Sequence, residues 1–207
     1  LDKRIPVAAG LGGGSSDAAA ALRALDRLWG LAWPVERLAS LAERIGSDVP
    51  FFLYGGTALA EGRGERVTPL PPLPPCWVVL AVQEPAARQK TAALYARLRP
   101  EDWTQGEATA ALVQWLRQGS PGRMPPLWNA FRRHAFEAFP GLVEAWRAFL
   151  DAGAYRVHVS GTGPALFALE PDETRARRVH AHLRAAGIAA ELARTIDRAD
   201  PRQARQE

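Results

Sequence analysis

One stretch of the chain combines the residue types that cradle an anion. Residues 10–20 read Gly-Leu-Gly-Gly-Gly-Ser-Ser-Asp-Ala-Ala-Ala, and apolar residues recur at helical spacing after them. Glycine permits positive φ and close approach of a ligand to the backbone, and a helix start presents unpaired amides with about half a positive charge. The sequence therefore predicts a phosphate-binding turn that leads directly into a helix.

Two common phosphate loops do not fit this glycine run. A Walker loop needs a lysine and then Ser or Thr after its last glycine, whereas Ser15 and Ser16 follow Gly14 directly. A dinucleotide fingerprint that begins at Gly10 needs a third glycine where the chain has Ser15. A flexible Gly/Ser linker is the plainer alternative, but the helical pattern behind the run argues against it.

Further motifs follow the glycine run. Residues 46–52 read Gly-Ser-Asp-Val-Pro-Phe-Phe, residues 60–65 read Ala-Glu-Gly-Arg-Gly-Glu, and residues 160–163 read Ser-Gly-Thr-Gly. Together with Lys-Arg-Ile-Pro-Val-Ala-Ala at 3–9, they resemble the motifs of the GHMP small-molecule kinases in order and approximate spacing. The resemblance extends over nearly the whole chain and is greatest to the branch that acts on a cytidine diphosphate derivative of methylerythritol.

The resemblance implies ATP-dependent phosphorylation of an alcohol, with Mg²⁺ as the metal. It assigns nucleotide binding to Pro6, Val7, Ala8, Ala9, Gly10, Leu11, Gly12, Gly13, Gly14, Ser15 and Ser16. The metal ligands themselves are not indicated, and Ser15 and Ser16 could equally cap the helix. The resemblance also places residues 160–163 beside the phosphate loop, and it puts Asn129 before a helix, as a capping residue.

Asp48 is the candidate catalytic residue. Phosphoryl transfer is mostly positioning and charge neutralisation, plus a carboxylate that accepts the proton of the acceptor hydroxyl. Asp48 matches the catalytic aspartate of the resembled kinases, although an aspartate before Pro50 is also a common turn cap. For the substrate, the resemblance implies Thr91 and Tyr95, with the Tyr95 ring stacking on cytosine. The alternative for Tyr95 is a half-buried helix anchor.

Other functions stay open at this point. The runner-up is a GHMP kinase for homoserine or a mevalonate-like alcohol. A nucleotide-binding fragment without catalysis is a third hypothesis, because the resembled kinases carry a further N-terminal segment with their first motif. We expect the 207-residue chain to lack that segment and to have negligible activity by itself.

Composition supports a compact enzyme. The net charge of the 207 residues is +4. The basic residues of the chain are scattered among acidic ones, which argues against nucleic-acid binding. Cys76 is the single cysteine, so no intrachain disulfide can form, and no apolar run reaches the length of a membrane span. We therefore expect a cytoplasmic enzyme with a small-molecule substrate, no nucleic-acid partner and no membrane. The oligomeric state is not indicated.

Periodicity and turn residues predict the elements. Helices are predicted over residues 16–29, 34–44, 91–98, 108–116, 127–139, 141–150 and 172–186. Strands are predicted over residues 3–9, 57–61, 65–68, 76–82, 155–159, 165–169 and 188–196, with an acidic loop at Asp48. Helices cluster between strands without regular alternation, which favours an α+β sandwich over a doubly wound parallel sheet.

The resemblance implies the same class, in a two-domain fold. The N-terminal domain of that fold is like ribosomal protein S5 domain 2, and we expect it to be incomplete in this chain. The C-terminal domain is an α+β sandwich. Five prolines between Pro69 and Pro75 provide the clearest punctuation. We therefore expect an N-terminal, ATP-binding domain over 1–70 and a C-terminal domain over 76–200.

Overall fold

The computed structural model describes residues 1–83, 90–154 and 156–196. The chain divides into two compact units, each assembled from several segments. The first, here the sheet unit, contains residues 1–11, 75–111 and 125–195. The second, here the helical unit, contains residues 12–74 and 112–124, with Ile196. The glycine run therefore contributes to both units. The predicted limits of the domains, 1–70 and 76–200, stay a prediction.

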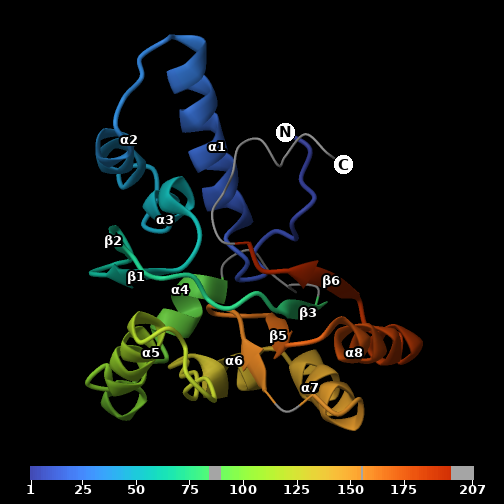
Figure 1. Ribbon diagram of the computed structural model, residues 1–207. Helices are drawn as coiled ribbons and strands as arrows, with labels where there is room; N and C mark the ends of the chain where they lie inside the picture. Colours follow the sequence, from blue (N-terminus) through green and yellow to red (C-terminus); the bar gives the residue numbers. More distant parts are fainter. Residues whose placement is uncertain (84–89, 155, 197–207) are drawn as a thin grey trace. The chain divides into compact units, whose positions relative to one another are not determined.

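The helical unit contains three helices and a hairpin (Figure 1). They are α1 (Gly13–Leu28), α2 (Val35–Ala42), α3 (Val49–Tyr54), β1 (Ala58–Glu61) and β2 (Arg66–Pro69). The two strands pair antiparallel, as the glycines between them predict.

Small and aliphatic side chains form the core of the helical unit. Ala19 of α1, Leu38 and Ala42 of α2, and Val49 and Leu53 of α3 are all buried there. The alanines let the helix backbones approach closely, because they add little volume at the contact. Full burial of a side chain such as Leu53 stabilises the fold by roughly 1.5–3 kcal/mol, so this cluster fixes α3 against α1 and α2.

The sheet unit is built on four antiparallel strands. They are β3 (Trp77–Val82), β4 (Val157–Val159), β5 (Ala165–Glu170) and β6 (Ala190–Arg194), in the order β4-β5-β3-β6. Successive side chains along a strand point to opposite faces of the sheet. The register of the strands therefore decides which buried side chains share one face. Val79 lies opposite Ala168, and Ala168 lies opposite Val157, and all three are buried.

Helices pack on that buried face of the sheet. They include α7 (Gly141–Asp151) and α8 (Glu173–Ala185), which lie along the sheet in Figure 1. Phe149 of α7 and Leu183 of α8 are fully buried in one cluster with the strand residues. Two short helices, α4 (Lys90–Tyr95) and α6 (Arg132–Ala138), complete this unit together with the 3₁₀ turn η1 (Pro100–Asp102).

One helix crosses the division between the units. The helix α5 (Glu107–Arg117) runs through the point between Ala111 and Leu112 where the division falls. The α+β class predicted from sequence is confirmed, since every strand pairing in the described chain is antiparallel and helices are clustered between strands.

Two sequence predictions about elements were wrong, and one helix was not predicted. Residues 3–9 form no strand, because Pro6 has no amide to donate and Ala8 takes φ 58°, outside extended backbone. The loop at Asp48 is confirmed as a turn, but the helix α3 that follows it was not predicted, because its six residues are too few to show a helical period. The helix predicted from residue 127 begins only at Arg132. Of the strand predicted over 155–159, residue 155 lies outside the described residues.

Candidate active site

The glycine run turns sharply at two positions where only glycine fits. Gly10 has φ 77°, and a Cβ there would overlap the backbone oxygen of Ser160. Gly12 has φ 68°, and a Cβ there would lie 2.5 Å from Cζ of Phe52. Left-handed φ is unfavourable for residues with a side chain, and here the neighbouring atoms also exclude one. The spacing of these glycines is therefore set by both backbone conformation and packing.

The turn leaves backbone donors free at the start of α1. Gly12 is the N-cap, and it accepts a hydrogen bond from the Ser16 amide at 2.9 Å, but no side chain caps this helix. The amides of Gly13, Gly14 and Ser15 donate to no acceptor among the described residues. A long helix places partial positive charge at these amides, so the start of α1 is suited to an anion.

The two serines do not cap α1. Ser16 lies within the helix, and its hydroxyl donates to the carbonyl of Gly13 at 2.8 Å. Ser15 makes no side-chain hydrogen bond within the described residues and is partly exposed. The helix starts at Gly13, three residues before the start predicted from periodicity, because glycines conceal the amphipathic pattern. The residues just before the run differ in exposure: Pro6, Val7 and Ala8 are exposed, whereas Ala9 is buried.

Asp48 occupies the N-cap position of α3, yet its carboxylate does not cap the helix. The side chain accepts no hydrogen bond from the first turn of α3, and it makes no ion pair in the described part of the chain. It is exposed, and a Cβ at Gly64 would lie 3.1 Å from its Oδ1. The turn between β1 and β2 thus approaches a carboxylate that has no protein partner in the described chain.

The helix α3 joins the start of α1 to Asp48. Its residue Phe52 lies against Gly12, and the carbonyl of Leu53 accepts a hydrogen bond from the guanidinium of Arg23 in α1. Asp48 precedes the same helix. The free amides of α1 and the carboxylate before α3, which have no partners in the described chain, are therefore held by two helices that pack together in one unit. The sequence did not reveal this role of Phe52, since its run of apolar residues is equally typical of a buried strand.

The second glycine turn supports the first half of the glycine run. The hydroxyl of Ser160 donates to the carbonyl of Gly10 at 2.7 Å. The turn itself is closed by two backbone bonds, from Gly163 to Ser160 at 2.8 Å and from Ser160 to Ala165 at 2.9 Å. The expectation that residues 160–163 lie beside the phosphate loop is confirmed within the sheet unit.

Asn129 holds the second glycine turn from the other side. Its Oδ1 accepts a hydrogen bond from the Phe131 amide at 2.8 Å, which closes a turn before α6. The expected helix cap is not observed, since the N-cap residue of α6 is Phe131 and no side chain caps this helix. Its Nδ2 also donates to the carbonyls of Val159 at 2.9 Å and Gly161 at 2.8 Å. Sequence alone did not indicate the contacts of Nδ2, because the partners lie 30 and 32 residues away.

The two residues predicted to bind substrate lie in α4. The side chain of Thr91 lies outside the described residues. Tyr95 is 57% exposed, and its ring meets Phe131 edge to face, with centroids 4.8 Å apart. Phe131 therefore contacts the Tyr95 ring while much of the side chain stays accessible, an arrangement that suits stacking. Both roles remain predictions.

Neither a cluster of metal-ligating side chains nor a membrane-spanning helix occurs among the described residues. No three His, Cys, Asp or Glu side chains come together there as a metal site. Among the same residues, no helix is both long and apolar enough to span a membrane.

The family of the chain follows from its two matched domains. Residues 1–56 match the N-terminal domain of the GHMP kinases, and residues 110–189 match the C-terminal domain. The class that fold and site define is therefore an ATP-dependent kinase of small molecules.

Relatives specify the member of this class. The chain is 47% identical over 199 residues to a 4-diphosphocytidyl-2-C-methyl-D-erythritol kinase of Dehalococcoides mccartyi, covering 95% of the chain and 69% of that relative. A crystal structure of 4-(cytidine 5'-diphospho)-2C-methyl-D-erythritol kinase matches with a TM-score of 0.77 and 41% identity, over 94% of this chain and 69% of that one. The chain belongs to the 4-diphosphocytidyl-2-C-methyl-D-erythritol kinases of the GHMP family.

A more distant structure shares only the fold. Homoserine kinase from Cytophaga hutchinsonii matches with a TM-score of 0.69 at 20% identity, over 95% of this chain and 68% of that one. The homoserine alternative therefore gains no support beyond the common architecture.

Proposed function

We propose that the chain carries the phosphate loop and the catalytic base of a kinase that transfers the γ-phosphoryl group of ATP to the 2-hydroxyl of 4-diphosphocytidyl-2-C-methyl-D-erythritol. This reaction belongs to non-mevalonate isoprenoid biosynthesis. One observation carries the proposal. The helical unit contains both the amides at the start of α1 and the carboxylate of Asp48, and neither has a hydrogen-bond partner among the described residues. We place the reaction in the cytoplasm, where a chain with one cysteine, Cys76, has no need of disulfides.

The glycine run supplies the binding of ATP. Amides of Gly13, Gly14 and Ser15 donate to phosphate oxygens, and the partial charge of the α1 N-terminus stabilises them. A Cβ at Gly14 would meet nothing within 4 Å, so phosphate can approach the backbone there. Ser160 and Asn129 act indirectly, by holding the turn at Gly10 in its left-handed conformation.

Asp48 supplies the base. Its carboxylate accepts the proton of the 2-hydroxyl while the hydroxyl oxygen forms a bond to the γ-phosphorus. The bond between that phosphorus and the β–γ bridging oxygen breaks, and ADP leaves. The Asp48 carboxylate is free for this step because no residue of the described chain occupies it. Positioning and charge neutralisation supply the remainder of the acceleration.

Mg²⁺ fits this site only with help from the phosphates. The described residues form no three-ligand metal cluster, and magnesium usually combines one or two protein oxygens with phosphate and water. Ser15 is the candidate protein ligand, because its hydroxyl has no partner among the described residues and adjoins the free amides. When bound, Mg²⁺ neutralises charge on the transferring phosphate.

Acceptor competition tests the proposal. The protein expressed from its complete gene is given ATP with 4-diphosphocytidyl-2-C-methyl-D-erythritol, homoserine and mevalonate together, and the products are separated by mass. We expect phosphorylation of the cytidine compound alone, since the exposed ring of Tyr95 favours an acceptor that carries a base. A preference for either other alcohol would overturn the substrate, and phosphorylation of none of them would overturn the kinase assignment.

A further inference from the structure

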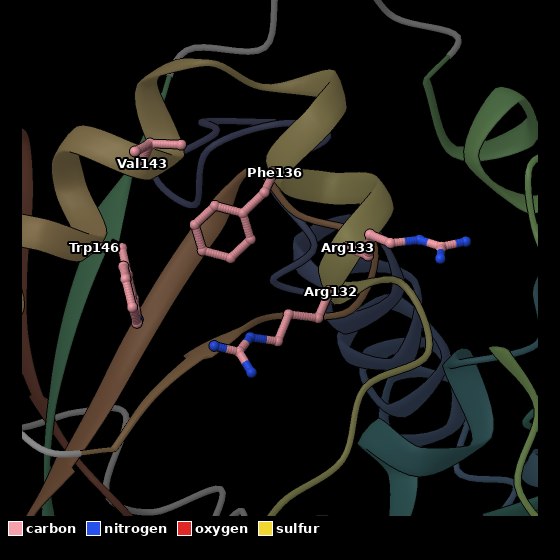
Figure 2. A pocket seen from close by; sticks show the side chains of 5 residues that line it. All are labelled: Arg132, Arg133, Phe136, Val143 and Trp146. Carbon is pink, nitrogen blue, oxygen red and sulfur yellow. The ribbon is translucent and has the colours of Figure 1, made fainter.

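A pocket of about 380 Å³ opens on the surface of α6 and α7 in the sheet unit. It is lined by Arg132, Arg133 and Phe136 of α6 and by Val143 and Trp146 of α7 (Figure 2). None of these residues belongs to the glycine run, the Asp48 turn or α4. Its volume is within the range of small-molecule sites in proteins.

The wall of the pocket is apolar and largely aromatic. Phe136 and Trp146 meet edge to face, with centroids 6.1 Å apart and planes at 82°, and Val143 adds an aliphatic surface beside them. Both rings are only partly buried. Such a wall favours an apolar body, because aromatic pairs hold their geometry and gain further contact when a third group packs against them.

Arg132 adds a positive charge that has no protein partner in the described chain. Figure 2 shows its guanidinium extending from α6 toward the space beside the two rings, whereas Arg133 points away. Arg133 is the paired arginine, since its guanidinium lies 3.4 Å from Oδ1 of Asp102. Arg132 is exposed, and it makes no hydrogen bond or ion pair with the described residues. A guanidinium in this setting is suited to a bidentate anion.

The surroundings of Arg132 reinforce that charge. Burial, followed by the charges of Arg132 and Arg156, lowers the pKa of His158 below its usual value. The buried Nε2 of His158 has no hydrogen-bond partner among the described residues. Arg132 and Arg156 therefore both add positive charge near His158, and positive charge favours an anion over a cation.

We propose that this pocket binds a small amphiphilic anion, an apolar or aromatic group that carries a phosphate or a carboxylate. Its apolar body packs against Phe136, Val143 and Trp146, and its anionic group pairs with Arg132. A neutral apolar molecule leaves the guanidinium unpaired, and an inorganic anion leaves the aromatic wall bare. The combination of both groups in one molecule is what the pocket selects.

Nuclear magnetic resonance of the 207-residue chain tests the proposal. The probe is phenyl phosphate, followed through the indole N–H resonance of Trp146, which Trp146→Phe identifies among the seven tryptophans. Phenylacetate, benzyl alcohol and inorganic phosphate are titrated in parallel. We expect phenyl phosphate or phenylacetate to shift the Trp146 resonance, and benzyl alcohol and inorganic phosphate to bind at least tenfold more weakly. The stronger of the two anions identifies the anionic group.

Two variants separate Arg132 from general charge. Arg132→Gln removes the guanidinium and leaves the apolar wall, and we expect at least a tenfold loss of affinity. Arg147→Gln, at an exposed position of α7 outside the lining, is the matched control and should bind as the wild type does. Equal binding by both variants would overturn the proposal. So would a Trp146 resonance that does not move at saturation with either anion, because phosphate then binds elsewhere, at the glycine run for example.

Discussion

The two glycine turns of this chain have similar composition and different uses. The turn at residues 10–14 leaves three amides at the start of α1 without an acceptor in the described part of the chain, whereas the turn at residues 160–163 is closed by its own backbone bonds. The second turn is further held by the side chain of Asn129, and it holds the first through Ser160. Glycine content therefore does not define a binding loop; unpaired donors at a helix start do.

The difference predicts which changes affect chemistry and which affect stability. Around the first turn, changes should alter binding or turnover. Around the second, they should lower stability first and affect the nucleotide only through Gly10. Variants of each region test this division.

The largest effect is expected for Asp48→Asn in the protein expressed from its complete gene. The amide keeps the shape of the side chain but is a far weaker base, so kcat should fall roughly a hundredfold or more while KM for ATP changes little. Steady-state kinetics measures both constants. Glu43→Gln, at the exposed end of α2, is the control and should leave kcat unchanged. A kcat for Asp48→Asn within threefold of wild type would return Asp48 to a purely structural role.

Gly10→Ala and Gly12→Ala should come next. Each places a Cβ at positive φ and against a neighbour, the Ser160 carbonyl or the Phe52 ring. Left-handed strain alone costs about 1–3 kcal/mol of unfolding free energy. The fixed backbone at Ser160 should make Gly10→Ala the worse of the two, because a ring can shift more easily.

Gly14→Ala is the matched control for stability. Gly14 is helical and its Cβ would meet nothing within 4 Å, so alanine should stabilise α1 by up to about 1 kcal/mol. Urea unfolding measures all three variants. If Gly10→Ala and Gly14→Ala have the same midpoint, the constraint assigned to the first turn is wrong.

Asn129→Ala should lower the free energy of unfolding by about 1–3 kcal/mol, because it leaves the carbonyls of Val159 and Gly161 and the Phe131 amide without their partner.

Ser160→Ala removes a single hydrogen bond to Gly10 and should lower the free energy of unfolding by about 0.5–1.5 kcal/mol. Ser160→Thr keeps the hydroxyl and serves as its control. Thermal unfolding with and without ATP checks the division between regions: a loss of ATP binding without a loss of stability in either alanine variant would contradict it.

The smallest effect concerns the support of α6, the helix that follows Asn129. Asp102 is 8% exposed, and its pKa is lowered by the hydrogen bond from His134, then by the Arg99 amide and the charge of Arg133. A lowered folded pKa means that the ionised form stabilises the fold above the unfolded value of about 4, and that this contribution is lost as pH falls further.

Asp102→Asn should therefore be less stable than wild type at pH 7, and the difference should shrink below about pH 4. Urea midpoints between pH 3 and 7, in steps of one unit, measure the difference. A gap that stays constant over this range would show that the carboxylate charge makes no contribution.

The sequence by itself determined the α+β class, and it predicted a phosphate-binding turn and a candidate base. Those features depend on local chemistry: glycine clusters, helical and alternating periodicity, and an aspartate before Pro50. The same local reasoning failed for residues 3–9, whose apolar pattern suited a strand although Pro6 and Ala8 prevent one.

Only the tertiary structure decided which polar groups stay unpaired. Whether Asp48 caps α3, and whether Ser15 caps α1, depends on where the helix axes and neighbouring turns place the donors. Contacts such as Asn129 to Gly161 join residues far apart in the chain, so no local pattern encodes them. Free donors and free carboxylates follow from the whole hydrogen-bond network, and a linear sequence does not display that network.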